Sequence, residues 1–239
     1  MQRWAGILRK ILGKEVLRVA LGIRRSSRPG DQQPTRLGCV LGAALGLWLV
    51  AAGTRVHGES PLTDRLTEHI AAQQQRTEIP AAYAPIDYRV FAQLPTPQIR
   101  TVSDLAAVEE VERNAVALTG YIVRVIPVPI HLTGRRATEW EFYLHLRVGP
   151  ARRCEYQDDA RNLVAVVTPS FQPPHTGWDF EALYDLCREQ TRVRISGWLL
   201  YDYLSRTRVG HSRASAWSIH PVTQIEAWNP RDRSWTPLR

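Results

Sequence analysis

The pattern of apolar and polar residues becomes strand-like after residue 114. Residues 140–147 alternate strictly between apolar and polar side chains, as expected of a strand with one buried face. Residues 163–168 are almost continuously apolar, which suits a strand that is covered on both faces. Together with three β-branched segments, they predict five strands, at 116–126, 140–147, 163–168, 193–203 and 217–225.

One helix is predicted within this series, between the third and the fourth strand. Asp179 is a favourable N-cap residue, and Leu183, Leu186 and Cys187 then share one helical face. The order is three strands, one helix and two strands, so the predicted fold class is mainly β.

Residues 54–113 predict a partly helical arm that precedes the strands. Pro61 favours a helix start, because the first helical position needs no N–H group. A second helix is predicted from Thr101, which forms a capping-box pattern with Asp104. Between these helices, extended chain without regular structure is predicted by prolines at 80, 85, 95 and 97.

Two predicted strands carry similar phrases, VALTGYIV (116–123) and VRISGWLL (193–200), each with a glycine at its centre. A glycine inside a strand usually marks a bulge or a sharp bend. The element order and these glycines make residues 114–228 resemble the OB-fold. The resemblance implies a five-stranded Greek-key barrel with the helix between strands three and four. A split barrel or a small sandwich is the competing architecture.

Residues 37–53 are apolar, and no charge lies between Arg36 and Arg55. As a helix this uncharged stretch would reach roughly 27 Å, close to the thickness of a bilayer's hydrocarbon core. We expect an uncleaved transmembrane anchor. Small residues at Ala51 and Gly53 leave cleavage of a signal peptide directly after Gly53 as the alternative.

The charge of the chain is distributed unevenly. Residues 1–36 carry nine Lys and Arg against Glu15 and Asp31, which is +7 of the total net charge of +8. By the positive-inside rule this segment stays in the cytoplasm. We therefore expect a single-pass protein of the inner (cytoplasmic) membrane, with its C-terminal part periplasmic or extracellular. That part is nearly neutral, which argues against double-stranded nucleic acid as a partner.

Cys154 and Cys187 are the only cysteines beyond the apolar stretch. In an oxidising compartment such a pair predicts either a disulfide or two separate thiols, and the sequence leaves both open.

The OB resemblance implies a ligand site on the second and third strands and on the loops that follow the first and the fourth. These segments carry arginines and tyrosines, which suit an anion and a planar group. The candidate ligand-binding residues are Arg135, Arg136, Tyr143, Arg147, Tyr201, Tyr203, Arg206, Arg208 and Arg213. The competing interpretation is a solvated surface, because the chain has no lysine after Lys14 and arginine supplies its surface cations.

Two aromatic residues, Tyr121 and Trp198, each follow a strand glycine and are predicted to point outward. Outward aromatic side chains on neighbouring strands favour burial. We expect the proline-rich part of the arm, residues 80–98, to cover them both.

No catalytic or metal-binding pattern emerges from the sequence. The histidines at 131, 145, 175, 211 and 220 share no ligand-like spacing, so we expect no metal and no other cofactor. Ser170, Ser218 and Cys154 lack the setting of an activated nucleophile. Staphylococcal-type nucleases also use an OB-like barrel, and the acidic pair 158–159 is the nearest approach to their carboxylate cluster.

The expected function is that of a membrane-anchored, non-catalytic binding module that engages an envelope protein or an anionic ligand. The alternative is a hydrolase for phosphorylated or nucleic-acid-like substrates. The expected organisation is a basic segment (1–36), an anchor or signal (37–53), an arm (54–113), an OB-like domain (114–228) and a C-terminal tail (229–239).

Overall fold

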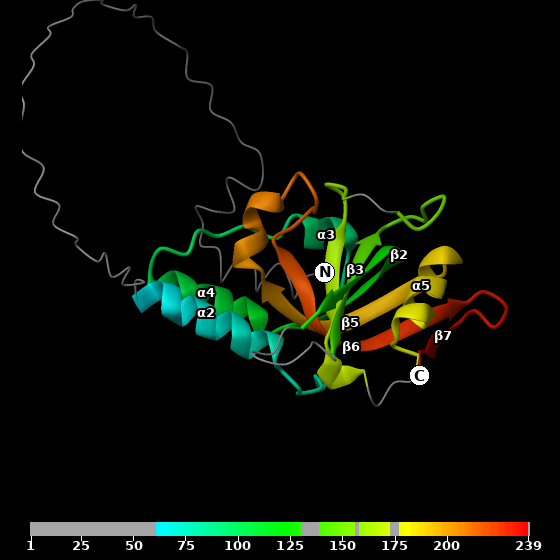
Figure 1. Ribbon diagram of the computed structural model, residues 1–239, viewed down its shortest axis with the longest axis horizontal. Coiled ribbons are helices and arrows are strands. Elements are labelled where there is room, and N and C mark those ends of the chain that lie inside the picture. Colours follow the sequence, from blue (N-terminus) through cyan, green and yellow to red (C-terminus); the bar gives the residue numbers. More distant parts are fainter. Residues whose placement is uncertain (1–60, 131–138, 156–157, 173–176, 239) are drawn as a thin grey trace, which may run out of the picture. The chain divides into compact units, whose positions relative to one another are not determined.

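The computed structural model of the protein describes residues 61–130, 139–155, 158–172 and 177–238 (Figure 1). The basic segment and the predicted anchor lie outside these residues. None of the helices in the described part is long and apolar enough to cross a membrane.

The described chain is mainly β, with a mixed sheet of seven strands. The five predicted strands are confirmed as β2 to β6. The strands are β1 (Ala84–Ile86), β2 (Ala115–Pro129), β3 (Trp140–Arg147), β4 (Leu163–Val167), β5 (Arg192–Tyr201), β6 (Trp217–Asn229) and β7 (Ser234–Pro237).

The central strands pair in the order β2–β3–β4–β6–β5, and β5 pairs again with β2. The long strand β2 closes this cycle because residues 115–121 pair with β5 and residues 121–129 pair with β3. The pairings within the cycle are antiparallel except that between β4 and β6, which is parallel. Most apolar side chains of these five strands are buried, and β4 is buried along its whole length, as its continuous apolar sequence predicts.

The two strand glycines lie where neighbouring chains approach too closely for a side chain. A Cβ atom on Gly197 would lie 2.2 Å from the carbonyl oxygen of Pro221, and one on Gly120 would lie 2.5 Å from that of Arg147. The β5–β6 register also shifts on both sides of Gly197, so the predicted bulge is confirmed there. Any larger residue would push these strands apart.

The predicted helix between the third and the fourth strand is α5 (Phe180–Arg188), which packs against β2. The side chain of Asp179 accepts a hydrogen bond from the Ala182 N–H at 2.8 Å, so it is the N-cap. Leu183, Leu186 and Cys187 are buried as predicted. A short 3₁₀ helix, η1 (Pro169–Phe171), follows β4.

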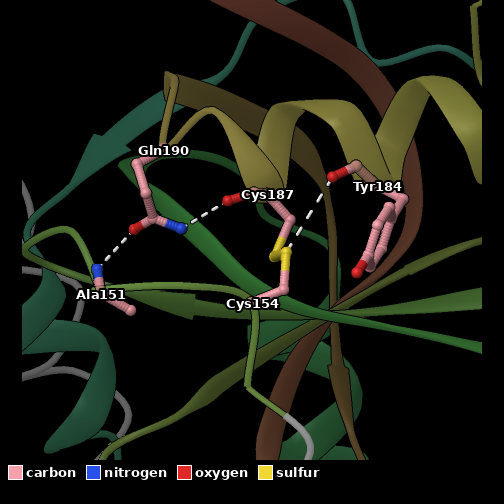
Figure 2. Close-up of a disulfide and its surroundings, with 5 residues drawn as sticks. All are labelled: Ala151, Cys154, Tyr184, Cys187 and Gln190. Atoms are coloured by element: carbon pink, nitrogen blue, oxygen red, sulfur yellow. Dashed lines mark hydrogen bonds between the residues drawn. A yellow bond between two sulfur atoms is a disulfide. The ribbon is translucent and has the colours of Figure 1, made fainter.

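A disulfide joins Cys154, beyond the end of β3, to Cys187 on α5 (Figure 2). Of the two alternatives left open by the sequence, the structure therefore has the bridge, with the two Cα atoms 5.6 Å apart. The Gln190 side chain connects the same two segments, because it accepts from the Ala151 N–H and donates to the Cys187 carbonyl. This cross-link ties α5 to the loop that follows β3.

The arm contains more regular structure than its sequence predicts. The predicted helices form as α2 (Pro61–Gln74) and α4 (Val102–Glu112), and Thr101 and Asp104 make the capping box. The prediction of irregular chain between them was wrong, because β1 and α3 (Tyr88–Ala92) lie there. Strand β1 pairs only with β2, so a proline at its centre interrupts no second row of strand hydrogen bonds.

The proline-rich part of the arm lies against β5 and β6 and accepts hydrogen bonds from their aromatic side chains. Tyr201 Oη donates to the Pro97 carbonyl at 2.6 Å, and Trp217 Nε1 donates to that of Pro95 at 2.7 Å. Extended, proline-rich chain leaves carbonyls free for such bonds. The proline-rich part of the arm therefore packs against the sheet as part of the folded domain.

Trp198 is covered from just upstream of the segment that we expected. Its Nε1 donates to the Glu78 carbonyl at 2.9 Å, and the Arg76 guanidinium lies 3.8 Å from the centre of its ring. The expectation that one cover serves both aromatic residues was wrong. Trp198 pairs with Ala115 and Tyr121 with Arg192, at opposite ends of the β2–β5 ladder.

Helices α2 and α4 lie side by side and share a buried ion pair (Figure 1). His69 Nε2 lies 2.6 Å from a carboxylate oxygen of Glu112, which is 1% exposed. The other Glu112 oxygen accepts from the Tyr201 N–H at 2.8 Å. The hydrogen bond between His69 and the Glu112 carboxylate raises the pKa of His69, against the opposing effect of burial. Glu112 thereby joins both helices to β5.

The predicted C-terminal tail is also partly a strand. Strand β7 pairs with the end of β6, and the Trp228 and Trp235 rings meet edge to face with centroids 5.1 Å apart. The alternation of Trp235 with small polar neighbours is too short to reveal a strand by its pattern alone.

Candidate functional site

A cavity of about 490 Å³ lies above β2 and β3. The 3₁₀ helix η2 (Tyr203–Arg208) and the loop after it form its other wall. The cavity has the size of a small-molecule site. Its charged and polar lining includes Arg124, Tyr143, His145, Asp158, Asp202, Arg208, Ser212 and Arg213.

The alternation of β3 places Tyr143 and His145 on one face, and both line the cavity. Arg124 on β2 pairs in register with His145 and adds a guanidinium beside it. This guanidinium forms an ion pair with Asp158, which follows β3. The floor of the cavity is thus set by the register of two antiparallel strands.

The loop after β5 is fixed by a buried arginine. Arg213 is 4% exposed and pairs with Asp202, with Nη1 2.8 Å from a carboxylate oxygen. It also donates to the carbonyls of Ser215 and Trp217. Asp202 is the N-cap of η2, since its side chain accepts from the Ser205 N–H. One ion pair therefore holds both ends of this wall.

The ionised side chains that line the cavity include one more cation than anions. Arg124 and Asp158 cancel each other, as do Arg213 and Asp202. Among the residues that the structure describes, Arg208 has no ion-pair partner. Burial lowers the pKa of His145 to about 4, and the Arg124 guanidinium adds to this shift. His145 is thus neutral near pH 7, and the lining carries a net charge of +1.

Tyr143 is a neutral phenol in this cavity. Burial raises its pKa above the ordinary value, and the carboxylates of Glu141 and Asp202 raise it further. It can therefore donate or accept a hydrogen bond, but it does not supply a phenolate near pH 7.

The structure separates the predicted ligand-binding residues. Tyr143, Arg208 and Arg213 line the cavity, and Arg213 does so as a buried structural residue. Arg206 lies over the Tyr203 ring, 3.8 Å from its centre. Arg135 and Arg136 lie outside the described residues.

Two of the predicted residues already use their polar groups inside the protein. Arg147 makes two hydrogen bonds to the Glu155 carboxylate, at 2.7 and 2.6 Å, and its Nε donates to Asn162. Tyr201 is buried, and its hydroxyl is bound to the arm. The sequence interpretation assigned both residues to the site because their positions on or beside the predicted strands suited it. The sequence pattern does not reveal the groups that they bind in the folded chain.

Several lining residues were missed by sequence reasoning. Arg124 gave a usable signal, because a charge interrupts an apolar strand there and a buried charge needs a partner. Asp158 was noticed only as part of an acidic pair, and Asp202, Leu204 and Ser212 gave no signal, since each lies in a polar segment that is typical of a loop.

The described part of the chain contains no group of three or more His, Cys, Asp or Glu side chains that could hold a metal ion. His211 is exposed, and His220 is buried. His131 and His175 lie outside the described residues. The two carboxylates that line the cavity are both engaged with arginines.

The chain was compared with protein-family models and with curated proteins. No family model matches it, and no curated protein matches it significantly.

Proposed function

We propose that this protein is a membrane-anchored, non-catalytic binding module whose OB-like domain holds an anionic ligand in the β2–β3 cavity. The observation that carries the proposal is the excess cation in that cavity. Arg208 faces a hollow in which every other described charge is paired. An anion would complete this balance.

The strand pairing supports the OB-like part of the proposal. An order of β2–β3–β4–β6–β5 that returns to β2, with α5 between β4 and β5, agrees with the element order behind the resemblance. The cavity then occupies the face that such domains use for ligands. Fold alone carries no function, so the ligand has to be argued from the residues of the cavity.

The charge asymmetry and the disulfide support the proposed location. The +7 segment at residues 1–36 precedes an apolar stretch, which is the arrangement of an N-terminus that stays in the cytoplasm. Disulfides persist mainly in oxidising compartments, and Cys154 and Cys187 are bridged. Both features favour an exported domain.

The pairing of the lining carboxylates favours binding over hydrolysis. A general acid or base must be free to exchange a proton with its substrate. Asp158 and Asp202 each accept charge-assisted hydrogen bonds from an arginine. The hydrolase alternative therefore has no free carboxylate among the described lining residues.

Titration calorimetry of the exported part with inorganic phosphate tests the proposed site. We expect saturable binding that weakens with rising salt, since a partly exposed guanidinium is screened within about 8–10 Å. Replacement Arg208→Gln should lower the affinity at least fivefold, which is the loss of roughly 1 kcal/mol from a charged hydrogen bond.

Arg231→Gln is the matched control, because Arg231 is equally exposed but lies in the β6–β7 turn, outside the cavity lining. It should bind phosphate as the wild type does. No binding by the wild type, or equal losses in both variants, would reject the cavity as an anion site.

A further inference from the structure

The hydrogen-bond chain behind the cavity fixes the proton of His145. Arg147 can only donate, and its Nε lies 2.8 Å from Asn162 Oδ1. The other end of the Asn162 amide, Nδ2, is therefore the donor in the 3.0 Å contact with His145 Nδ1. His145 Nδ1 accepts, so the ring carries its proton on Nε2.

This chain is rigid because its members are buried or paired. Asn162 is fully buried and His145 is 6% exposed. Arg147 is held by both oxygens of Glu155. The Nε2–H of His145 is thus a fixed, neutral donor in a ring that lines the cavity, and it can bind an oxygen acceptor of a ligand.

Part of the cavity is apolar. Ile126, Val128 and Val164 contribute to its lining beside the polar residues. Leu204 also lines it, although its side chain is 77% exposed. An apolar ligand segment on Leu204 would remove this surface from water.

From this combination we propose that the ligand is an anionic amphiphile with a phosphate-like or carboxylate headgroup and a single apolar chain. The headgroup binds Arg208 and the Nε2–H of His145, and the chain lies along Ile126, Val128 and Leu204. This inference rests on the proposed anion site and adds the chain and the histidine donor to it.

A calorimetric series of inorganic phosphate, butyl phosphate and octyl phosphate, below the concentration of micelle formation, tests the role of the chain. Each methylene that enters the cavity should tighten binding about three- to fourfold. Octyl phosphate should therefore bind at least roughly 30-fold tighter than inorganic phosphate, and octyltrimethylammonium should not bind. Equal affinities along the series would overturn the amphiphile while leaving the anion site intact. A complete lack of binding would overturn both.

Leu204→Gln separates the chain from the headgroup. It should weaken octyl phosphate roughly fivefold or more, since a Leu contact surface is lost, and leave inorganic phosphate within about twofold. Val148→Gln is the matched control, because Val148 is 68% exposed but lies outside the cavity lining. An unchanged affinity of Leu204→Gln for octyl phosphate would contradict the proposed position of the chain.

Nitrogen-15 spectra of the wild-type protein test the histidine without a substitution. His145 should show the Nε2–H tautomer, and its Nε2 shift should move on addition of octyl phosphate but not of octyltrimethylammonium. The Nδ1–H tautomer, or no change with octyl phosphate, would remove His145 from the site.

Vesicles distinguish a free amphiphile from a lipid in a bilayer. A bilayer lipid keeps its chains in the membrane, so phosphatidic acid in phosphatidylcholine vesicles should not displace octyl phosphate. Displacement at equal total phosphate would overturn the chain-in-cavity arrangement.

Discussion

Arginines of this protein differ mainly in the partners that surround them. Arg147 and Arg213 are saturated by carboxylates, amides and carbonyls of the same chain, while Arg208 has no ionic partner among the residues described. A planar guanidinium holds five donors in a fixed fork that can connect several acceptors at once, whereas lysine offers three donors on one rotating nitrogen. The same residue type therefore serves as a structural connector at two positions and as a ligand contact, as proposed, at a third.

Replacement of Arg213 by methionine should destabilise the fold. The change leaves the Asp202 carboxylate and two carbonyls without their donor in a largely buried place, which costs about 3 kcal/mol or more. Arg208→Met should change the free energy of unfolding by no more than about 0.5 kcal/mol, since Arg208 is exposed. Urea unfolding followed by tryptophan fluorescence measures both, and similar midpoints would show that Arg213 is not a connector.

At the scale of single residues, the sequence predicts fewer than half of the residues that line the cavity. Tyr143 and Arg208 were predicted and line the cavity. The roles of Arg147 and Arg213 could not be predicted, because a charged residue at a strand end or in a loop usually lies in water and nothing local reveals a buried partner. The ion pair of Arg124 joins residues 34 positions apart, which only the folded register brings together.

At the scale of elements, predictions from periodicity were reliable for β2 to β6 and for α5. Strict alternation in β3 and the continuous apolar run of β4 each have one simple structural explanation, and Asp179 fixes the start of α5. Strand β1 and helix α3 were missed, because three to five residues are too few for a period to show. Their existence depends on contact with β2, which is a tertiary effect.

Removal of the disulfide should loosen the attachment of α5. The bridge closes a loop with a sequence separation of 33, which corresponds to about 3–4 kcal/mol in the chain-entropy model. The double variant Cys154→Ser, Cys187→Ser should lose that much stability in thermal or urea unfolding. The wild type in reducing agent should behave in the same way, and an unchanged midpoint in both would show that helix packing alone holds α5.

At the scale of the whole molecule, two buried histidines link stability to pH. Burial lowers the pKa values of His145 and His220 to about 4, and the Nε2 atom of His220 has no hydrogen-bond partner within the described part of the chain. The unfolded chain binds these protons near pH 6.5 and the folded chain only near pH 4. Stability is therefore present above pH 6.5 and is lost as the pH falls toward 4, by roughly 3 kcal/mol for each histidine.

Two other groups contribute to the pH dependence with the opposite sign. The raised pKa of His69 means that its contribution is fully present below about pH 6.5. Burial raises the pKa of Glu141, so the folded state binds this proton more readily than the unfolded state. The contribution of Glu141 to stability therefore increases as the pH falls and its carboxyl protonates. The free energy of unfolding, measured between pH 7 and pH 4, should fall, and His220→Leu should make this fall shallower. The exposed His211→Leu is the control, and an equal slope in all three proteins would exclude His220 as a source.

If residues 37–53 anchor the chain as proposed, the hydrogen bonds between the arm and strands β5 and β6 limit how far the cavity can lie from the membrane. A free arm of residues 54–113 would act as a leash of up to roughly 200 Å. Because the arm is folded from Pro61 onward, the proposed anchor at residues 37–53 is followed by only residues 54–60, which span at most about 25 Å. Under the proposed anchoring, the module would therefore stay in a thin layer at the bilayer surface, where partners or ligands would have to reach it.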